Sequence, residues 1–173
     1  MEQLSHFDEK FSKKKFPITL VLDNITGEAN IGSIFRLADA FNVEKIIFSG
    51  IKPNLKSRRL QKTSRNTHRT VKYELTEDAI HFLKSEKSNS EIFSLEITSA
   101  SIPVENFQYS VEKKKIILIL GNEASGINND FLDISDKHLH INMFGQNSSM
   151  NVAQATGIAL YEISKTISAF DKK

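Results

Sequence analysis

The sequence of 173 residues contains no cysteine. This absence excludes disulfide bonds, thiolate zinc sites and cysteine nucleophiles, and it is typical of proteins from reducing compartments. The N-terminal residues lack the basic and then apolar pattern of a signal peptide, and the longest aliphatic run, residues 116–120, is too short to span a bilayer. We therefore expect a cytoplasmic protein without a membrane segment.

Several motifs of common enzyme classes are also missing. Neither G-x-G-x-x-G nor G-x-x-x-x-G-K-[ST] occurs, which argues against the Rossmann and P-loop nucleotide sites. The serine-hydrolase motif G-x-S-x-G is absent as well. His138 and His140 alternate onto one face of an expected strand, but no third ligand follows nearby, so we expect no metal site.

The composition indicates one soluble globular domain, with 39% hydrophobic and 25% charged residues. We expect residues 1–15 to form a short N-terminal extension and residues 16–173 to form the domain. Apolar runs predict six strands. In several segments between these strands, the apolar residues recur at helical spacing. The expected strands cover 18–22, 46–48, 71–75, 92–97, 116–120 and 138–143, and the expected helices cover 31–41, 79–83 and 152–170. The alternation predicts an α/β fold with a mostly parallel six-stranded sheet covered by helices.

Positive charge is concentrated in one segment, although the net charge is only +2. No acidic residue lies between Ile51 and Tyr73, where eight residues are basic: Lys52, Lys56, Arg58, Arg59, Lys62, Arg65, Arg69 and Lys72. Residues 13–15 form a second basic cluster. Such local excess attracts polyanions, and a solvated basic loop is the alternative interpretation.

Residues 28–36 follow the first expected strand and open the first helix. Asn30 is a candidate N-cap. Arg36 follows Gly32 by four residues, so its side chain points over a residue without a Cβ, which leaves room for a ligand. Near the positive end of the helix, a phosphate or a developing alkoxide is favoured. The alternative is a capped helix with a surface pair between Arg36 and Asp39.

Residues 121–126 form a glycine-bracketed polar loop after the most apolar strand. Ligands of parallel sheets bind beyond the carboxyl ends of the strands, so this loop is well placed for recognition. Glu123 is a candidate to orient an arginine or to accept a ribose hydroxyl. A plain turn with an exposed glutamate is the alternative.

Residues 142–153 join the last expected strand to the last helix. Ser148 or Ser149 is a candidate N-cap for that helix. The segment holds more hydrogen-bonding side chains than one cap requires, namely Gln146, Asn147, Ser148, Ser149 and Asn151.

Taken together, the three loops resemble the signature motifs of the SpoU-type RNA 2′-O-ribose methyltransferases, which belong to the SPOUT superfamily with its α/β-knot fold. Residues 30–36 look like N-x-G-x-x-x-R, residues 121–126 look like G-x-E-x-x-G, and residues 149–152 look like S-L-N-V. The order and the positions at strand-to-helix junctions also match, over roughly residues 17–165.

The resemblance implies a C-terminal trefoil knot, an exception to the rule that chains do not thread, and a homodimer whose active site draws on both subunits. It implies S-adenosylmethionine as cofactor, bound mainly by backbone groups of Leu95, Glu96, Gly121, Asn122, Ile141, Met143 and Met150. RNA would lie along the basic surface and contact Arg58, Arg59, Lys62, Arg65, His68 and Arg69. The implied catalytic residues are Arg36, Asn30, Glu123, Ser149 and Asn151.

We expect Arg36 to stabilise the alkoxide and the adjacent phosphate, because a guanidinium keeps its proton, while a role as base stays open. Asn30 and Glu123 would hold Arg36 and the ribose, and Ser149 and Asn151 would order the last loop. Asn142 stands where the family usually has proline, which would loosen the cofactor loop, and Ala153 replaces a common serine. An inactive RNA-binding module and a base methyltransferase are the alternatives, and the RNA is a tRNA or an rRNA.

Overall fold

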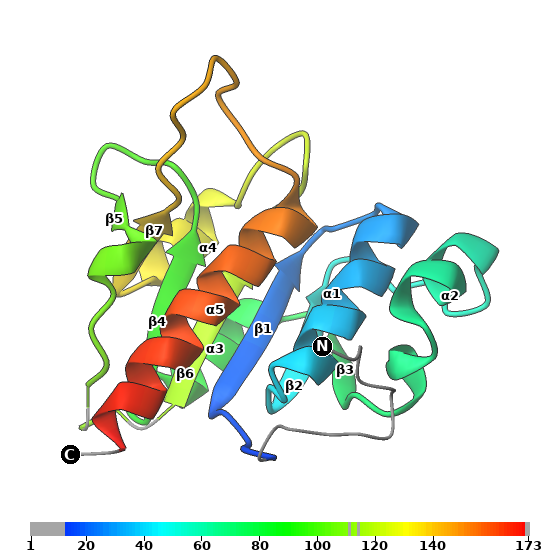
Figure 1. Ribbon diagram of the computed structural model, residues 1–173, viewed down its shortest axis with the longest axis horizontal. Helices are drawn as coiled ribbons and strands as arrows, with labels where there is room; N and C mark the ends of the chain where they lie inside the picture. Colours follow the sequence, from blue (N-terminus) through cyan, green and yellow to red (C-terminus); the bar gives the residue numbers. More distant parts are fainter. Residues whose placement is uncertain (1–12, 111, 114, 172–173) are drawn as a thin grey trace, which may run out of the picture.

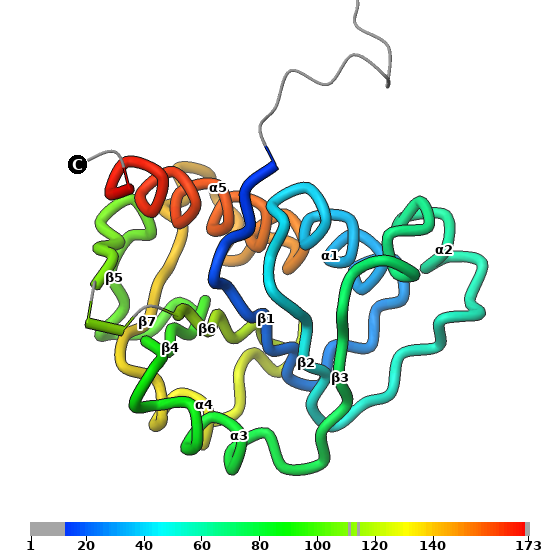
Figure 2. The backbone as a smooth tube through the Cα atoms, turned by 90° about the horizontal axis from the view of Figure 1, so that it is seen from below, coloured from blue at the N-terminus to red at the C-terminus, as the bar shows by residue number. Residues whose placement is uncertain are grey.

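The computed structural model describes residues 13–110, 112–113 and 115–171. In this part of the chain, seven parallel strands form one sheet in the order β3-β2-β1-β6-β4-β7-β5. Helices cover both faces: α1, α2 and α5 lie on one side and α3 and α4 on the other (Figures 1 and 2). The predicted α/β class and the parallel sheet are confirmed.

The strands are β1 Ile18–Asp23, β2 Lys45–Ser49, β3 Tyr73–Thr76, β4 Ser90–Leu95, β5 Ile102–Pro103, β6 Lys115–Leu120 and β7 Lys137–His140. The prediction of six strands is therefore wrong by one. The additional strand, β5, has two residues and pairs with β7 at the edge of the sheet. Such a short strand leaves no periodic pattern in a sequence.

The helices are α1 Glu28–Ala40, α2 Arg58–Ser64, α3 Ala79–Glu86, α4 Asn129–Ile134 and α5 Val152–Phe170, with two 3₁₀ turns, η1 Thr67–Arg69 and η2 Val104–Asn106. The three helices with clear apolar spacing, α1, α3 and α5, were predicted. The short helices α2 and α4 were missed, because α2 buries only Leu60 and Ser64 and α4 buries only Phe131. None of the described helices is long and apolar enough to cross a membrane.

The central strand β6 packs against helices on both faces. Ile116, Leu118 and Leu120 belong to the core beneath α1 and α5, and Ile117 and Ile119 belong to the core beneath α3 and α4. This explains why the run at 116–120 has no polar alternation.

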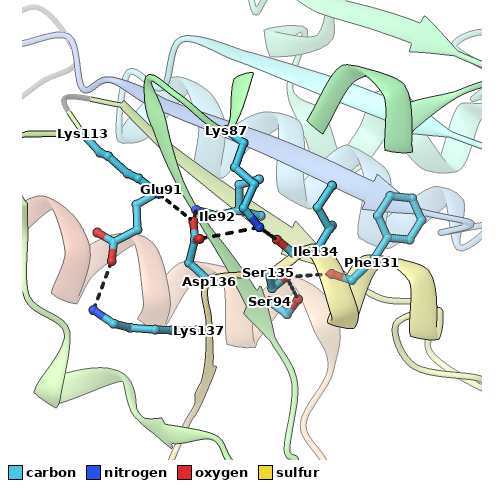
Figure 3. Close-up of polar contacts among 10 residues, drawn as sticks. All are labelled: Lys87, Glu91, Ile92, Ser94, Lys113, Phe131, Ile134, Ser135, Asp136 and Lys137. Atoms are coloured by element: carbon cyan, nitrogen blue, oxygen red, sulfur yellow. Dashed lines mark hydrogen bonds and ion pairs between the residues drawn. The ribbon is translucent and has the colours of Figure 1, made fainter. Parts of the chain in front are cut away.

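A polar cluster at the amino ends of β4 and β7 aligns these two strands (Figure 3). The backbone N–H of Ile92 donates to Oδ2 of Asp136 at 2.9 Å, and the N–H of Asp136 donates to the carbonyl of Ile92 at 2.8 Å. Lys113 and Lys87 lie 3.3 and 3.7 Å from the Asp136 carboxylate. These contacts define where β7 starts and therefore where the loop after it emerges.

The loops after β1, β4, β6 and β7 leave the sheet at its carboxyl edge. These strands are neighbours in the order β1-β6-β4-β7, so loops that are far apart in sequence meet there. Residues 141–151 project from this edge in Figure 1, where the segment is drawn in orange. Of the predicted N-terminal extension, residues 1–12 lie outside the described part of the chain.

Candidate active site

A cavity of about 510 Å³ lies at the carboxyl edge, beyond β4, β6 and β7. Leu95, Leu120 and Leu139, at or next to the ends of these strands, contribute apolar surface. All of the predicted cofactor residues line it, namely Leu95, Glu96, Gly121, Asn122, Ile141, Met143 and Met150. Contact between these residues and a cofactor stays a prediction.

Two glycines make the loop after β6 compact. A Cβ at Gly121 would lie 2.6 Å from the carbonyl carbon of Gly126 and the nitrogen of Ile127. Gly126 has a φ of +70°, a left-handed conformation that favours glycine. The side-chain oxygen of Asn122 accepts from the N–H of Ala124 at 2.8 Å, which closes the turn. The two glycines therefore let the loop fold tightly at the edge of the cavity.

The same loop is tied to β1 and β4. Asn122 donates from Nδ2 to the carbonyl of Asn24 at 2.7 Å, and the buried carboxylate of Asp23 accepts from the N–H of Asn128 at 2.8 Å. Glu96 accepts from the N–H groups of Ile97 and Ile127 at 3.1 and 3.2 Å. Hydrogen bonds to backbone donors thus hold the Glu96 carboxylate at the cavity wall.

Three predicted catalytic residues, one from each motif, form a hydrogen-bonded row. Asn151 donates from Nδ2 to Oδ1 of Asn30 at 2.9 Å, and Asn30 donates from Nδ2 to Oε1 of Glu123 at 2.5 Å. Glu123, Asn151 and the fourth predicted residue, Ser149, line the cavity. The row therefore links the first helix to both loops that form the cavity.

The predicted helix caps are wrong at both helices of the site. Helix α1 begins at Glu28 after Gly27, so Asn30 lies within its first turn and does not cap it. At α5 the cap is Asn151, whose Oδ1 accepts from the N–H groups of Ala153 and Gln154 at 3.0 and 3.3 Å, rather than Ser148 or Ser149. Asn151 consequently serves both the helix end and the row with Asn30.

The interpretation of Gly32 as space for a ligand is also wrong. A Cβ at this position would lie 2.0 Å from Oγ1 of Thr63 and 2.5 Å from the carbonyl oxygen of Leu60. Both residues belong to α2, which packs directly against α1. The glycine permits close contact between two helices.

Arg36 is exposed on α1 and does not line the cavity. Among the described residues it has no hydrogen-bond or ion-pair partner, neither Asp39 nor Glu123. The prediction that Asn30 and Glu123 hold Arg36 is not met within one chain, because Glu123 accepts from Asn30 instead.

The basic segment divides into exposed and buried residues. The side chains of Arg58, Arg59, Lys62, Arg65 and Arg69 are exposed along α2 and η1. His68 is 6% exposed, lies 2.7 Å from Oγ of Ser64 through Nδ1, and packs edge-on against Phe35. Burial, and secondarily the charge of Arg69, lower the pKa of His68. His68 is therefore buried against α1, unlike its exposed basic neighbours, and its contact with RNA stays a prediction.

A polar chain supports the loop after β7, and sequence analysis missed it. Nε2 of His140, a residue that lines the cavity, lies 3.3 Å from Oδ1 of Asn142, and Asn142 donates from Nδ2 to Oε1 of Glu105 at 2.8 Å. Nδ1 of His140 lies 3.0 Å from Oγ of Ser101. Asn142 was expected to loosen this loop, whereas its amide holds it from two sides. The alternation of His138 and His140 is visible in the sequence, but it was interpreted only in terms of metal binding.

Ala153, the second departure from the family pattern, is 7% exposed and belongs to the core beneath α1 and α5. Across the described residues, no three His, Asp or Glu side chains are grouped to hold a metal ion.

Comparison with known proteins places these features in a family. The model of the SpoU rRNA Methylase family matches residues 17–161, which include all three motif loops. The chain belongs to this family. The resemblance inferred from the motifs is confirmed.

Curated relatives in the family act on two kinds of RNA. The tRNA (guanosine(18)-2′-O)-methyltransferase of Aquifex aeolicus is 28% identical over 161 residues, which cover 93% of this chain and 75% of that protein. The 23S rRNA (guanosine-2′-O-)-methyltransferase RlmB of Haemophilus influenzae is 28% identical over 156 residues, which cover 90% of this chain and 63% of that protein.

Solved structures share the fold. The TrmH/SpoU tRNA modifying enzyme of A. aeolicus superposes with a TM-score of 0.80 at 26% identity, over 92% of this chain and 79% of that one. The AdoMet-bound rRNA methyltransferase of Sinorhizobium meliloti gives a TM-score of 0.78 at 23% identity, over 88% of this chain and 57% of that one. The seven-stranded parallel arrangement is therefore a SpoU-type fold.

Proposed function

We propose that this protein transfers the methyl group of S-adenosylmethionine to a ribose 2′-hydroxyl of a tRNA or rRNA. The observation that carries the proposal is the row Asn151–Asn30–Glu123 beside the 510 Å³ cavity, which joins one side chain from each family motif. Family membership and the names of the relatives, both guanosine 2′-O-methyltransferases, support it.

The cavity fits S-adenosylmethionine in size and chemistry. Its volume lies within the range of about 300–1,000 Å³ that is usual for small-molecule sites. Apolar side chains such as Leu95 and Leu139 suit an adenine ring, and the carboxylates of Glu96 and Glu123 suit a ligand that carries a cationic sulfonium. When bound, this cofactor supplies the methyl group. The holding residues would be the predicted set, Leu95, Glu96, Gly121, Asn122, Ile141, Met143 and Met150.

Glu123 and Asn30 orient the ribose. Oε1 of Glu123 accepts from Asn30, and within the described residues Oε2 has no partner, so it is available to accept a ribose hydroxyl. The bond to Asn30 restricts the carboxylate to one orientation. Asn151 fixes Asn30 in turn, and Ser149 completes the wall of the cavity. Positioning of this kind supplies much of the rate of a two-substrate reaction.

Arg36 stabilises two negative groups, namely the alkoxide that develops on the ribose and the phosphate next to it. The guanidinium keeps its own proton. Because Arg36 lies outside the cavity of its own chain, the arginine that serves each cavity comes from the partner subunit of a homodimer. The exposed apolar side chains of Ile158 and Tyr161 on α5 support such an assembly, since burial in an interface would remove them from water.

Mixed dimers test this arrangement. Arg36→Ala and Asn30→Ala should each abolish turnover as homodimers, while cofactor binding to Arg36→Ala, measured by calorimetry, stays at the wild-type level. If Arg36 acts across the interface, a mixed dimer contains one intact site, and mixing the two inactive variants restores activity. No restoration in verified mixed dimers would assign Arg36 to its own chain, and activity in the Arg36→Ala homodimer would remove its catalytic role.

We also propose the C-terminal trefoil knot of the family. The loops at 121–128 and 141–151 both meet the region after β1, through Asn122 with Asn24 and through Asn151 with Asn30, which supports a crossing there. A chain cyclised head to tail and then denatured tests it. A knotted ring migrates faster in a denaturing gel than an unknotted ring of equal length, and equal mobility would exclude the knot.

The RNA contacts the exposed basic residues of α2 and η1, namely Arg58, Arg59, Lys62, Arg65 and Arg69. We place the reaction in the cytoplasm, in a single domain of residues 16–173. Nucleoside mass spectrometry of treated tRNA and rRNA tests the function, with a 2′-O-methylated nucleoside as the expected product. A methylated base would identify a base methyltransferase, and the absence of S-adenosylmethionine binding by calorimetry would identify an inactive RNA-binding module.

A further inference from the structure

A second hollow of about 500 Å³ adjoins the cofactor cavity. The projecting loop forms most of it, and Gln154 from the first turn of α5 completes it. Four residues border both spaces, namely Met143, Ser149, Met150 and Asn151. A molecule that extends from the cavity over this border therefore enters the hollow directly.

The hollow presents one fully exposed aromatic ring. Phe144 is 98% exposed, more than any other large hydrophobic side chain of the described residues. It follows Met143, which faces the cavity, and it precedes Gly145, around which there is open space. A ring in this position stabilises nothing in the folded chain, because it packs against no neighbour. It is available for a ligand.

Neutral polar groups surround the ring. The side-chain amides of Gln146, Asn147 and Gln154 are exposed, and no hydrogen bond in the described part of the chain involves them. The sequence from Ile141 to Gln154 contains no charged residue. The hollow therefore lacks the cations that a phosphate or a carboxylate requires, and it combines a flat apolar surface with donors and acceptors.

A nucleobase matches this combination. Proteins bind unpaired bases of RNA by stacking them on aromatic rings and by hydrogen bonding to their edges, and each base has an apolar face and a polar rim. We propose that Phe144 stacks on a nucleobase of the RNA substrate and that the amides of Gln146, Asn147 and Gln154 bind its edge. The base belongs to the nucleotide whose ribose reaches the cofactor cavity or to its neighbour.

This subsite rests on the proposed function, but it is tested by binding rather than by turnover. The chain has no tryptophan, so Phe144→Trp introduces a single indole, which can be excited apart from the three tyrosines. Stacking on a base quenches indole emission, and we expect saturable quenching by unfractionated tRNA. Heparin, a polyanion without bases, should leave the emission unchanged. Phe170→Trp, at the last residue of α5, is the control and should not be quenched.

Two outcomes overturn the subsite. If a gel shift shows that tRNA binds but the emission of Phe144→Trp does not change, stacking is excluded. The proposed methyltransferase function is then left in place. A blue shift that grows with protein concentration in the absence of RNA would show instead that a second copy of the chain covers the ring.

Kinetics give an independent readout. Base stacking is typically worth about 1–3 kcal/mol, so Phe144→Ala should raise the KM for RNA by about 5- to 140-fold while the KM for S-adenosylmethionine stays unchanged. Phe144→Tyr keeps an aromatic ring and should retain the wild-type KM. Because the ring packs against nothing, the thermal midpoint of Phe144→Ala should equal that of the wild type. An unchanged KM for RNA would remove Phe144 from recognition.

Discussion

Nδ2 of Asn30 lies 2.5 Å from Oε1 of Glu123, although 93 positions separate the two residues in the sequence. They meet because β1 and β6 are neighbours in the sheet and their following loops emerge side by side. Asn30 also accepts from Asn151 through Oδ1, so its side-chain amide both donates and accepts a hydrogen bond. The geometry of the proposed active site therefore depends on one amide.

Asn30→Asp replaces the donor that faces Glu123 with a second carboxylate. The two acids repel each other, and the fixed orientation of Glu123 is lost. A hydrogen bond to a charged group contributes about 1.5–3 kcal/mol, so we expect kcat to fall by about 10- to 150-fold. Asn89→Asp, an exposed site at the amino end of β4, should retain the wild-type kcat. Equal rates for the two variants would show that the row has no role in the reaction.

Gly32→Ala tests the contact between α1 and α2. The new Cβ would lie 2.0 Å from Oγ1 of Thr63, so the helices must separate. Overpacking of this kind costs about 1–3 kcal/mol, and we expect the free energy of unfolding in urea to fall by that amount. At Gly145 no atom lies within 4 Å of a new Cβ, and Gly145→Ala should change stability by less than about 0.5 kcal/mol. A stable Gly32→Ala variant would argue against the tight helix contact.

Asn142→Ala removes the amide that joins His140 to Glu105. The loop that borders the cofactor cavity then loses two anchors, and we expect the Kd for S-adenosylmethionine, measured by calorimetry, to rise by roughly tenfold. Glu105→Gln keeps an acceptor oxygen for Asn142 and should bind the cofactor nearly as the wild type does. Wild-type affinity in Asn142→Ala would mean that the loop holds its shape without this amide.

His68 makes stability depend on pH. Burial and the nearby charge of Arg69 lower the pKa of His68 in the folded chain below the ordinary value of 6.5. The unfolded chain therefore binds the proton more readily, so the full stability is present above pH 6.5 and is lost progressively as the pH falls below it. Urea denaturation at successive pH values measures the effect. His68→Gln cannot titrate and should flatten this part of the profile, whereas an unchanged profile would assign the pH dependence to other groups.

The sequence predicted the sheet well where apolar runs were long. The run at 116–120 indicated a central strand, and β6 packs on both faces as expected. Strand β5 and helices α2 and α4 were missed because they bury few apolar side chains. For the site, motif spacing led to Asn30, Glu123, Ser149 and Asn151 as residues of three separate loops, and the structure brings three of them into one row.

The errors arose where a local pattern was interpreted without its tertiary neighbour. Gly32 was interpreted as space for a ligand because nothing within α1 fills it, yet α2 does. His68 was counted with the surrounding basic residues, although it packs against Phe35. Arg36 was expected beside Asn30 and Glu123, yet it is exposed on α1, and Glu123 accepts from Asn30 instead.

The cap that Asn151 places on α5 has a consequence for synthesis on the ribosome. Asn30 leaves the exit tunnel early, but its partner Asn151 and the helix that Asn151 caps emerge more than a hundred codons later. A nascent chain that stops before this point holds Asn30 and Glu123 of the first two motifs without Asn151, which fixes Asn30. Premature release would thus yield a fragment that lacks one residue of the row and the helix that this residue caps.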